Sequence, residues 1–535
     1  MREIDCDVLI AGAGTGGVAA ALAVSSLGLR VVLTEETNCV GGQLTSQGVP
    51  PDEHRWIEQF GCTARYRVYR DRVRQFYRTN RSLSAAVQAN PTFNPGTGWV
   101  SNLCAEPSVA WQVLAEMLQP AISAGNLTVL LKTIASGGAQ LSGPPLADPR
   151  IAPSVEGDRV ESVVLWNLET GSQTAVQAKY FLDATELGDL LPITRTEFVT
   201  GAEASDEAHA AQAASPGNHQ ALTWVFAMGH DEGSHRVVDR PEQYDRWRSF
   251  QPEFWPGPLL ALQDLDPQTN HPRTPPLPLF SAGWRCWFKY RQIYEPTQFD
   301  PPNGYPVTIV NWPQNDYFVG EIVDVSPDLR WQRLSDAKQL SLSLLYWLQT
   351  ECPRPDGRQG YPGLFLAPSM MGSEDGFALT PYIRESRRIA SLRTVKESDV
   401  SADEHPGMDR APAMPDSVGI GSYRIDLHPS TGGDAYIDLA TLPFQIPLGS
   451  LIPVRTRNLL PACKNIATTH ITNGCYRLHP VEWNVGEAAG LLAGFCIARS
   501  TEPQAVAGNL SLTQEFQHML RDQGVEIQWP TLTAS

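Results

Sequence analysis

The alternation of apolar and polar residues is most regular in the first fifty residues. Cys6 to Ala11 is a short apolar run of the kind that forms a buried strand, and Leu29 to Thr34 is a second one. Between them, Val18 to Leu27 is rich in Ala and Leu, contains no helix breaker and ends at Gly28. The pattern therefore predicts a strand, a turn, a helix and a second strand in succession.

Further elements follow the same periodicities up to about residue 200. Residues 106 to 124 predict a helix with a buried stripe. Strands are predicted at 127–131, 159–168 and 173–182, the last two as a hairpin. Trp56 to Arg81 carries seven arginines between Arg65 and Arg81 and predicts a helix, with residues 82–104 as loop. The arginines are interpreted either as a solvated helix face or as anion contacts near a cofactor.

The character of the chain changes between about residues 200 and 440. Strand patterns at 221–227, 305–310 and 317–323 are separated by proline-rich loops with many aromatic residues, and 331–350 predicts a helix. We interpret this part as an inserted substrate domain. Near the C-terminus, a short strand at 458–462 and a helix at 481–498 are predicted.

A glycine motif lies at the first turn. Residues 12–17 fit G-x-G-x-x-G, and Glu35 follows the second strand, 23 residues after Gly12. Gly12 allows the tight turn, Gly14 lets the backbone approach a pyrophosphate, and Gly17 lets helix and strand pack closely. The helix N-terminus attracts phosphate, and Glu35 can accept hydrogen bonds from a ribose. The alternative is a glycine-rich turn in an ordinary α/β unit, but the register of all four parts favours a dinucleotide site.

A glycine pair follows the ribose acid. Gly41, Gly42 and Gln43 resemble the flavoprotein loop that closes over FAD. The alternative interpretation is a simple turn. Together with the first motif, Gly42 and Gln43 make FAD the predicted cofactor, rather than NAD alone.

Size and charge limit the possibilities. A chain of 535 residues predicts two or more domains. The net charge of −17 argues against nucleic acid or an anionic membrane as the main partner. No apolar stretch reaches the roughly 18 residues of a membrane span, and no leader peptide is visible. The nine cysteines are scattered, which favours a reduced, cytoplasmic protein without a disulfide framework.

Three polar residues precede the last helix. His470, Arg477 and His479 lie where a closing helix would place its N-terminus, near Pro480, against a flavin ring. Either histidine could serve as the base that removes a substrate proton, because the pKa of histidine is near neutrality. Arg477 could hold a carboxylate substrate or the flavin itself. The alternatives are a histidine that caps the loop and an arginine in an ordinary ion pair.

Several segments, taken together and in order, resemble one family. They are the residue-12 motif, Gly41-Gly42, Glu106-Pro107, Asp183-Ala184-Thr185, Arg384-Glu385-Ser386-Arg387-Arg388, Ile446-Pro447, Leu451-Ile452-Pro453 and the block from His470 to Gly490. The chain resembles the bacterial FAD-dependent oxidoreductases among the glutathione-reductase-like flavoproteins. It departs from the family pattern at Glu186, where Gly is usual, and at Ala462-Cys463-Lys464, where Ala-Gly-Arg is usual.

The resemblance implies an α/β fold with a Rossmann-like, glutathione-reductase-like FAD-binding domain and an inserted α+β substrate domain. Residues 1–50, 105–200 and 440–500 would form the FAD-binding domain, and 200–440 the inserted domain. Residues 51–104 would be a helical and loop insertion, and 501–535 a C-terminal extension. Asp183, Thr185 and Gly486 would join the FAD site, and Arg387 or Arg388 would line the substrate pocket.

The implied reaction is hydride transfer between a small alcohol, amine or acid and N5 of FAD. The alternatives are a flavin monooxygenase or halogenase, or a redox-inactive FAD-binding protein. The halogenase motif G-W-x-W-x-I-P does not occur in the sequence. No cysteine pair suits a disulfide reductase, and no metal-ligand spacing occurs. The electron acceptor, oxygen or a redox partner, stays open.

Overall fold

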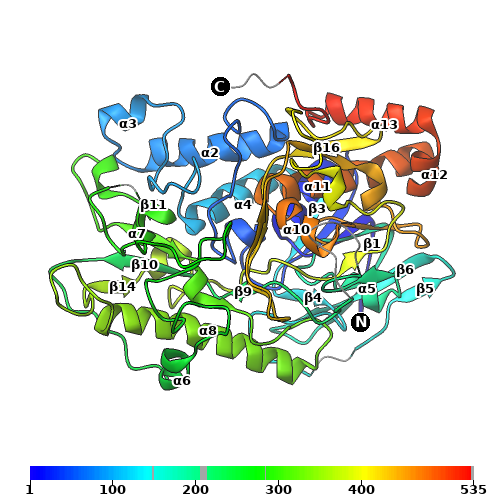
Figure 1. Ribbon diagram of the computed structural model, residues 1–535. Helices are drawn as coiled ribbons and strands as arrows, with labels where there is room; N and C mark the ends of the chain where they lie inside the picture. Colours follow the sequence, from blue (N-terminus) through cyan, green and yellow to red (C-terminus); the bar gives the residue numbers. More distant parts are fainter. Residues whose placement is uncertain (148–149, 205–213, 284, 532–535) are drawn as a thin grey trace.

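A mixed sheet of eight strands forms the larger half of the protein (Figure 1). The computed structural model describes residues 1–147, 150–204, 214–283 and 285–531. Four neighbouring strands form a parallel run, in the order β3 (Leu127–Leu130), β2 (Val31–Thr34), β1 (Arg2–Ala11) and β7 (Gln173–Asp183). This is the curled sheet expected of a Rossmann-like FAD-binding domain.

The long strand β7 has different neighbours at its two ends. Its first residues pair antiparallel with β6 (Arg159–Asn167), which continues to β4 (Thr133–Ala135) and β5 (Ser154–Glu156). Its last residues, Phe181 to Asp183, pair in parallel with β20 (Leu459–Pro461). The C-terminal part of the chain thereby reaches the edge of the sheet where β1 meets the glycine turn.

Both faces of the central strand are buried. Val8 and Ile10 of β1 pack into the core on one side, and Leu9 and Ala11 pack into the core on the other. This is typical of parallel strands covered on both faces. On the first side lie α1 (Thr15–Ser26), α4 (Pro107–Ser123) and α11 (His479–Arg499).

Helices α1 and α11 approach each other through glycines. A Cβ on Gly486 would lie 1.9 Å from the carbonyl oxygen of Gly16, and a Cβ on Gly490 would lie 2.9 Å from that of Ala20. Such distances leave no room for a side chain, so the two backbones are in direct contact. The N-terminal ends of the two helices consequently lie close together.

A second sheet, of four antiparallel strands, has the order β11 (Gln292–Tyr294), β12 (Val307–Val310), β10 (Phe226–His230) and β14 (Leu364–Leu366). The long helix α8 (Pro327–Thr350) runs beneath it along the lower edge of Figure 1. Aromatic and leucine side chains, among them Trp247, Trp312 and Leu344, form the core here. The boundaries proposed for the inserted domain stay a prediction.

The remaining α-helices and strands lie around these two sheets. They are α2 (Ala64–Asn80), α3 (Ala85–Ala89), α5 (Leu190–Ile193), β8 (Phe198–Val199), β9 (Leu222–Thr223), α6 (Tyr244–Ser249), α7 (Trp287–Tyr290), β13 (Asp316–Tyr317), α9 (Pro368–Met371), β15 (Arg388–Ile389), β16 (Ser417–Gly421), β17 (Ile425–Leu427), β18 (Ile437–Leu439), β19 (Phe444–Pro447), α10 (His470–Tyr476), α12 (Pro503–Gly508) and α13 (Leu510–Asp522).

Some predicted elements were wrong in detail. The strand predicted at 317–323 is reduced to β13, and the one predicted at 221–227 divides into β9 and β10. The region predicted as loop at 82–104 contains α3. Residue 470, predicted in a loop, begins α10, because Thr469 caps this helix by accepting the N–H of Thr472.

The arginines of the segment 65–81 differ: Arg72 and Arg81 are exposed, as a solvated face predicts, whereas two others fit neither interpretation. Arg70 and Arg74 are buried, and both donate to the carboxylate of Glu58 at 2.6 Å. Arg70 also pairs with Glu53 at 2.8 Å. Their charges are neutralised within the fold, so they neither form a solvated face nor remain available to a cofactor.

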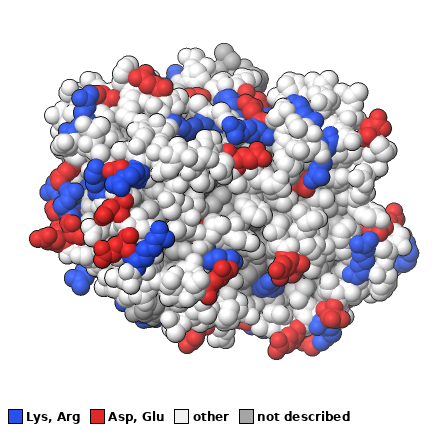
Figure 2. All heavy atoms as spheres, turned by 180° about the vertical axis from the view of Figure 1, so that it is seen from behind, with Lys and Arg blue, Asp and Glu red and all other residues white. Residues whose placement is uncertain are grey.

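Charged side chains are dispersed over the face shown in Figure 2. Acidic and basic groups lie side by side there, separated by broad uncharged areas. The net charge of −17 is therefore not gathered into one acidic field on this face. Among the described residues, no helix is long and apolar enough to cross a membrane.

Candidate active site

The glycine turn between β1 and α1 is shaped by close backbone contacts. Gly12 has a φ of +92°, and a Cβ there would lie 2.3 Å from the carbonyl oxygen of Ala184. A Cβ on Gly17 would lie 2.0 Å from the carbonyl oxygen of Gly12. Gly14 is the N-cap of α1 and has no side chain to cap the helix. The first N–H groups of α1 are thus available to an acceptor from elsewhere.

Two carboxylates lie at this helix N-terminus. The N–H of Gly16 donates to Oε1 of Glu482 at 3.2 Å, and a Cβ on Gly14 would lie 3.0 Å from Oε1 of Glu186. Glu482 belongs to the first turn of α11, so the close packing of α1 and α11 brings it here. A phosphate group is attracted to a helix N-terminus by the same N–H groups.

The two departures from the family pattern contact each other. Nζ of Lys464 forms an ion pair with Oε2 of Glu186 and donates to the carbonyl oxygen of Ile383 at 2.8 Å. Burial alone would lower the pKa of Lys464, but the Glu186 and Glu482 carboxylates raise it above its ordinary value. Glu186 replaces the usual glycine without a positive φ, since the left-handed residue of this turn is Gly188, with a φ of +65°.

Glu35, the residue predicted to bind a ribose, lies in a small cavity. Glu35 is buried, with Oε2 accepting the N–H of Ala13 at 3.2 Å and Oε1 accepting the N–H of Thr37 at 2.9 Å. Burial raises the pKa of Glu35 to about 7. A cavity of about 60 Å³, called the ribose cavity below, is lined by Glu35, Gly12, Gly14, Gly42, Thr185 and Glu186. Six residues from three separate predicted motifs therefore meet here.

Asp183 and Thr185 support the turn beside Gly12. Oδ1 of Asp183 accepts Oγ1 of Thr185 at 2.7 Å, and Oδ2 accepts the N–H of Leu190 at 2.9 Å. Both carboxylate oxygens of Asp183 are thus used within the fold. Gly486 contributes by contacting Gly16 rather than by lining the cavity.

Gln43 connects the glycine turn to the C-terminal helices. Its Nε2 donates to the carbonyl oxygen of Arg477 at 3.0 Å and also bonds the carboxylate of Glu482. Arg477 is the C-cap of α10, just before α11 begins. The loop predicted to close over FAD therefore contacts the segment predicted to face its ring.

The two candidate histidines have different surroundings. His470 is buried, and its Nδ1 lies 2.9 Å from Oε1 of Glu385. His479 is the first residue of α11, and its Nδ1 accepts the N–H of Asp52 at 3.0 Å. Burial lowers the pKa of His479 to about 3. His479 is consequently neutral at ordinary pH with its proton on Nε2, and its role as base stays a prediction.

Arg477 lines a larger cavity of about 290 Å³. Its Nη1 donates to Oη of Tyr382 at 3.1 Å, and its Nη2 donates to the carbonyl oxygen of Asp426 at 3.0 Å. The charged residues around this cavity are five arginines and three aspartates. They are Arg273, Arg285, Arg291, Arg384, Arg477, Asp52, Asp264 and Asp426.

The sequence did not indicate a pair of residues beside this cavity, His428 and Asp316. Nδ1 of His428 lies 2.5 Å from Oδ2 of the fully buried Asp316. Burial would raise the pKa of Asp316, but the neighbouring Arg384 and His428 hold it below its ordinary value. The second ring nitrogen of His428 lies 3.9 Å from Asp426 at the cavity. Residues 316 and 428 are 112 positions apart, so no local pattern could pair them.

The three arginines of the Arg-Glu-Ser-Arg-Arg motif lie in three different places. Arg384 lines the 290 Å³ cavity. Arg388 forms ion pairs with Glu385 and Glu203 inside the core, and Arg387 lines another hollow, beside Asp324. Arg384 is thus the arginine of this motif at the 290 Å³ cavity, and a substrate contact of Arg387 or Arg388 stays a prediction.

Comparison with family models identifies the family. Residues 7–520 match the model described as FAD dependent oxidoreductase. The match covers nearly the whole chain, so the protein belongs to this family of FAD-dependent oxidoreductases. It is a flavoenzyme, and its cofactor is FAD.

Comparison with curated proteins gives no match. Similar solved structures include L-proline dehydrogenase from P. horikoshii, with 15% identity over 38% of this chain and 24% of that one, and a TM-score of 0.19. They also include a geranylgeranyl bacteriochlorophyll reductase-like protein from Thermoplasma acidophilum, with 10% identity over 98% and 85% of the two chains and a TM-score of 0.33.

A third similar structure is the OxyS anhydrotetracycline hydroxylase from Streptomyces rimosus, with 11% identity over 97% and 66% of the two chains and a TM-score of 0.35. The chain spans about a quarter of the length of the dehydrogenase, at 24%. At these TM-scores the likenesses carry no argument about the reaction or the substrate of this chain.

Unpartnered polar atoms fit a bound FAD. Among the described residues, Oε1 of Gln43, Nε2 of Gln47, Nε2 of His479 and Nε of Arg477 are buried without a hydrogen-bond partner. Buried polar groups normally have partners, and these include both donors and an acceptor. Gln43 contacts Arg477, and Arg477 lines the 290 Å³ cavity. These unpartnered donors and the unpartnered acceptor suit a cofactor with a polar ring.

We expect the affinity for FAD to fall as the pH rises through about 7. Burial raises the pKa of Glu482 to about 7, and its carboxylate lies at the helix N-terminus where the FAD diphosphate is attracted. Two anions in one place repel, so FAD binding favours protonated Glu482. The Kd should rise by up to about tenfold per pH unit above this value.

The measurement is FAD titration of the apoprotein by fluorescence between pH 6 and pH 9. The Glu482→Gln variant should bind FAD with little pH dependence. Glu487→Gln removes a carboxylate from the same helix at a site that contacts Arg65, and it should keep the wild-type dependence. Equal pH profiles for Glu482→Gln and the wild type would contradict this account.

Proposed function

We propose that the protein oxidises a small organic acid, with the substrate carboxylate held in the 290 Å³ cavity. The observation that carries this proposal is the set of five arginines that line the cavity, four of which are held in place by ion pairs with aspartates. A cavity of this size and charge suits a small anion. FAD, when bound, supplies the acceptor for a hydride from the substrate carbon.

Three arginines of the cavity keep unused hydrogen-bonding capacity. Nε atoms of Arg291, Arg384 and Arg477 are buried and have no partner among the described residues. Each guanidinium also has a carboxylate neighbour: Asp52 for Arg291 at 3.0 Å, Asp316 for Arg384 at 3.1 Å, and Asp426 for Arg477 at 3.3 Å. These ion pairs fix the guanidinium groups in place before a substrate binds.

Aromatic side chains form the rest of the wall. The lining includes Trp99, Trp287, Tyr290, Tyr382 and Tyr436. Oη of Tyr436 is buried without a partner among the described residues. The wall therefore offers planar apolar surface and a hydroxyl as well as positive charge. This composition favours an acid with an apolar body over a fully polar one.

The proton acceptor is proposed to be His428. Oxidation of an alcohol or amine carbon releases a hydride and a proton, and the proton needs a base within reach. Asp316 binds the Nδ1 side of His428, which leaves Nε2 as the basic nitrogen toward the cavity. His479, with its proton on Nε2, is better placed to donate a hydrogen bond, and His470 is held by Glu385.

The choice of substrate class is tested with matched acids and amides. Arg477→Gln should weaken the binding of a carboxylate substrate about 10- to 100-fold, because it removes a charged hydrogen-bond donor. The neutral amide of the same compound should be affected much less. Arg424→Gln removes a surface arginine that pairs with Asp438, outside the cavity, and should leave both unchanged.

The measurement is flavin bleaching by a panel of 2-hydroxy and 2-amino acids and their amides in stopped flow. Loss of bleaching by acid and amide alike, at normal flavin content, would contradict the carboxylate role. Bleaching only by neutral compounds would exclude acids as substrates. Product that contains an atom from oxygen gas would instead indicate a monooxygenase.

The proposed base is tested by three single replacements. His428→Asn should slow flavin reduction about a hundredfold or more, the usual scale for a general base, while flavin content stays near normal. Added imidazole should restore part of the rate. His470→Asn leaves the buried Glu385 without its histidine, so it should reduce stability and flavin content more than the rate per bound flavin.

Rates are compared after normalisation to bound flavin. A large rate loss in His479→Asn or His470→Asn, with none in His428→Asn, would assign the base to the C-terminal segment as the sequence predicts. Wild-type rates in all three variants would mean that no histidine of this group removes the proton.

A further inference from the structure

A second hollow lies beside the ribose cavity. It has a volume of about 500 Å³, and Gly137, Gly138 and Gln140 line it. Ala139 and Leu141 of the same segment line the ribose cavity instead, and Ile134 lines both. One stretch of chain thus separates the two spaces. Neither the glycine motif nor Glu35 borders the larger hollow.

The hollow contains a buried arginine, Arg330, that forms no ion pair with any described carboxylate. Arg330 is 8% exposed, and its Nε donates to the carbonyl oxygen of Ile322 at 2.9 Å. Its two Nη groups have no partner, and no carboxylate lies within ion-pair distance, in the part of the chain that the structure describes. Burial lowers the pKa of Arg330, as expected of a charge removed from water.

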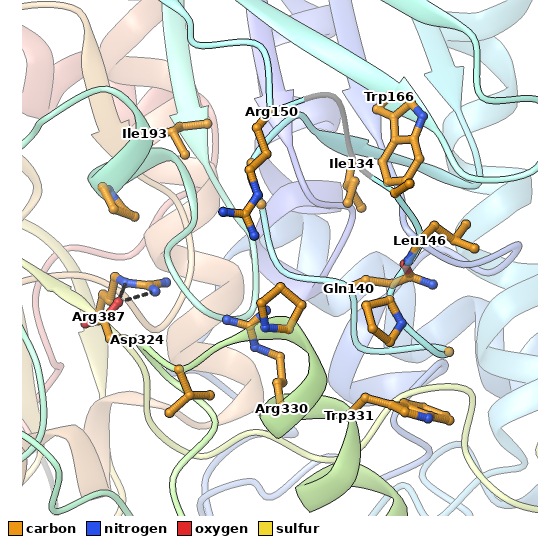
Figure 3. A pocket seen from close by; sticks show the side chains of 18 residues that line it. Ile134, Gln140, Leu146, Arg150, Trp166, Ile193, Asp324, Arg330, Trp331 and Arg387 are labelled. Carbon is orange, nitrogen blue, oxygen red and sulfur yellow. Dashed lines mark hydrogen bonds and ion pairs between the residues drawn. The ribbon is translucent and has the colours of Figure 1, made fainter.

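Other arginines frame the same space. Figure 3 shows Arg150 and Arg330 reaching into the hollow from opposite sides, with their guanidinium groups turned toward each other. Arg387 lies at one end, where Asp324 at 2.6 Å and Asp189 at 3.3 Å balance its charge. The unbalanced charge is therefore at Arg330, in the centre. Guanidinium groups arranged in this way suit a phosphate group.

The other side of the hollow is apolar. Trp166 and Trp331 lie on the side away from Arg387, with Leu146 between them (Figure 3). Indole rings offer flat surfaces on which a planar ring can stack. The hollow therefore joins a cationic part to an aromatic part, at a size typical of ligand sites.

We propose that this hollow is a second ligand site, which binds a nucleoside phosphate in addition to FAD. The phosphate would contact Arg330, and the base would lie against the tryptophans. The site is separate from the proposed substrate cavity, because the two share no lining residue. It does not depend on the carboxylate substrate, so its failure would leave the proposed oxidation untouched.

The main competing occupant is the adenine end of FAD itself, because Ile134 borders both spaces. The two possibilities differ in one respect. A second ligand binds to protein that already holds one FAD per chain, whereas an adenine pocket is closed in that protein. The test therefore uses the FAD-loaded enzyme throughout.

The experiment is calorimetric titration of the FAD-loaded protein with ADP, pyrophosphate and adenosine. We expect ADP to bind more tightly than either pyrophosphate or adenosine, because only ADP uses both parts of the hollow. Arg330→Gln should weaken ADP binding about tenfold or more, through loss of charged hydrogen bonds. Arg330→Lys keeps the charge and should retain part of the affinity.

The control is Lys338→Gln, which removes a positive charge from the same helix where Lys338 pairs with Asp375 at the surface. It should bind ADP as the wild type does. Thermal unfolding and flavin content of each variant show whether it is folded. No ADP binding to the FAD-loaded protein would overturn the proposal. Binding to the apoprotein alone, with FAD affinity reduced in Arg330→Gln, would assign the hollow to the adenine of FAD.

Discussion

The direct backbone contact between α1 and α11 is the constraint on which the candidate site depends. The backbones of Gly16 and Gly486 are in direct contact, with no side chain between the two helices at this point. Their N-terminal turns meet as a result, and Glu482 reaches the N–H of Gly16. The start of α1 is the predicted site of the FAD diphosphate, and the start of α11 follows Arg477, which lines the 290 Å³ cavity. One contact thus links the predicted cofactor end of the site to its proposed substrate end.

Charge balance around the diphosphate position is the second constraint. Glu186 and Glu482 bring two negative charges to a place that must accept an anion, and Lys464 stands between them. The family pattern has Gly and Arg at positions 186 and 464. Glu186 therefore adds a negative charge, while Lys464 keeps the positive charge of the usual arginine and forms an ion pair with Glu186. The turn keeps its shape because Gly188, and not Glu186, has the positive φ.

Local patterns were sufficient to predict the strand–turn–helix unit and the closing helix from sequence, because each depends on residues within about 25 positions. The contact of Gln43 with Arg477, which joins the two parts, was not predicted. The substrate side was harder, because its residues come from distant segments. Asp316 begins the two-residue strand β13, and His428 directly follows the three-residue strand β17, so no periodicity indicates that the two residues are paired.

Burial also altered roles that residue type alone suggested. A histidine in the right segment is a reasonable base, but His479 has its pKa lowered by burial and its Nδ1 occupied by Asp52. Anion contact was one interpretation of the arginines of α2, yet Glu53 and Glu58 from the preceding loop neutralise Arg70 and Arg74. Such outcomes depend on tertiary partners that no local pattern contains.

The most direct test of the account is the flavin content of the Gly14→Glu variant. The wild-type protein should purify yellow, and mass spectrometry of the released ligand should give FAD. Gly14→Glu puts a side chain and a third carboxylate against the diphosphate position, so the folded variant should be colourless. Gly508→Glu, at an exposed helix end with open space around it, should remain yellow. A folded Gly14→Glu protein with normal FAD content would contradict the site described above.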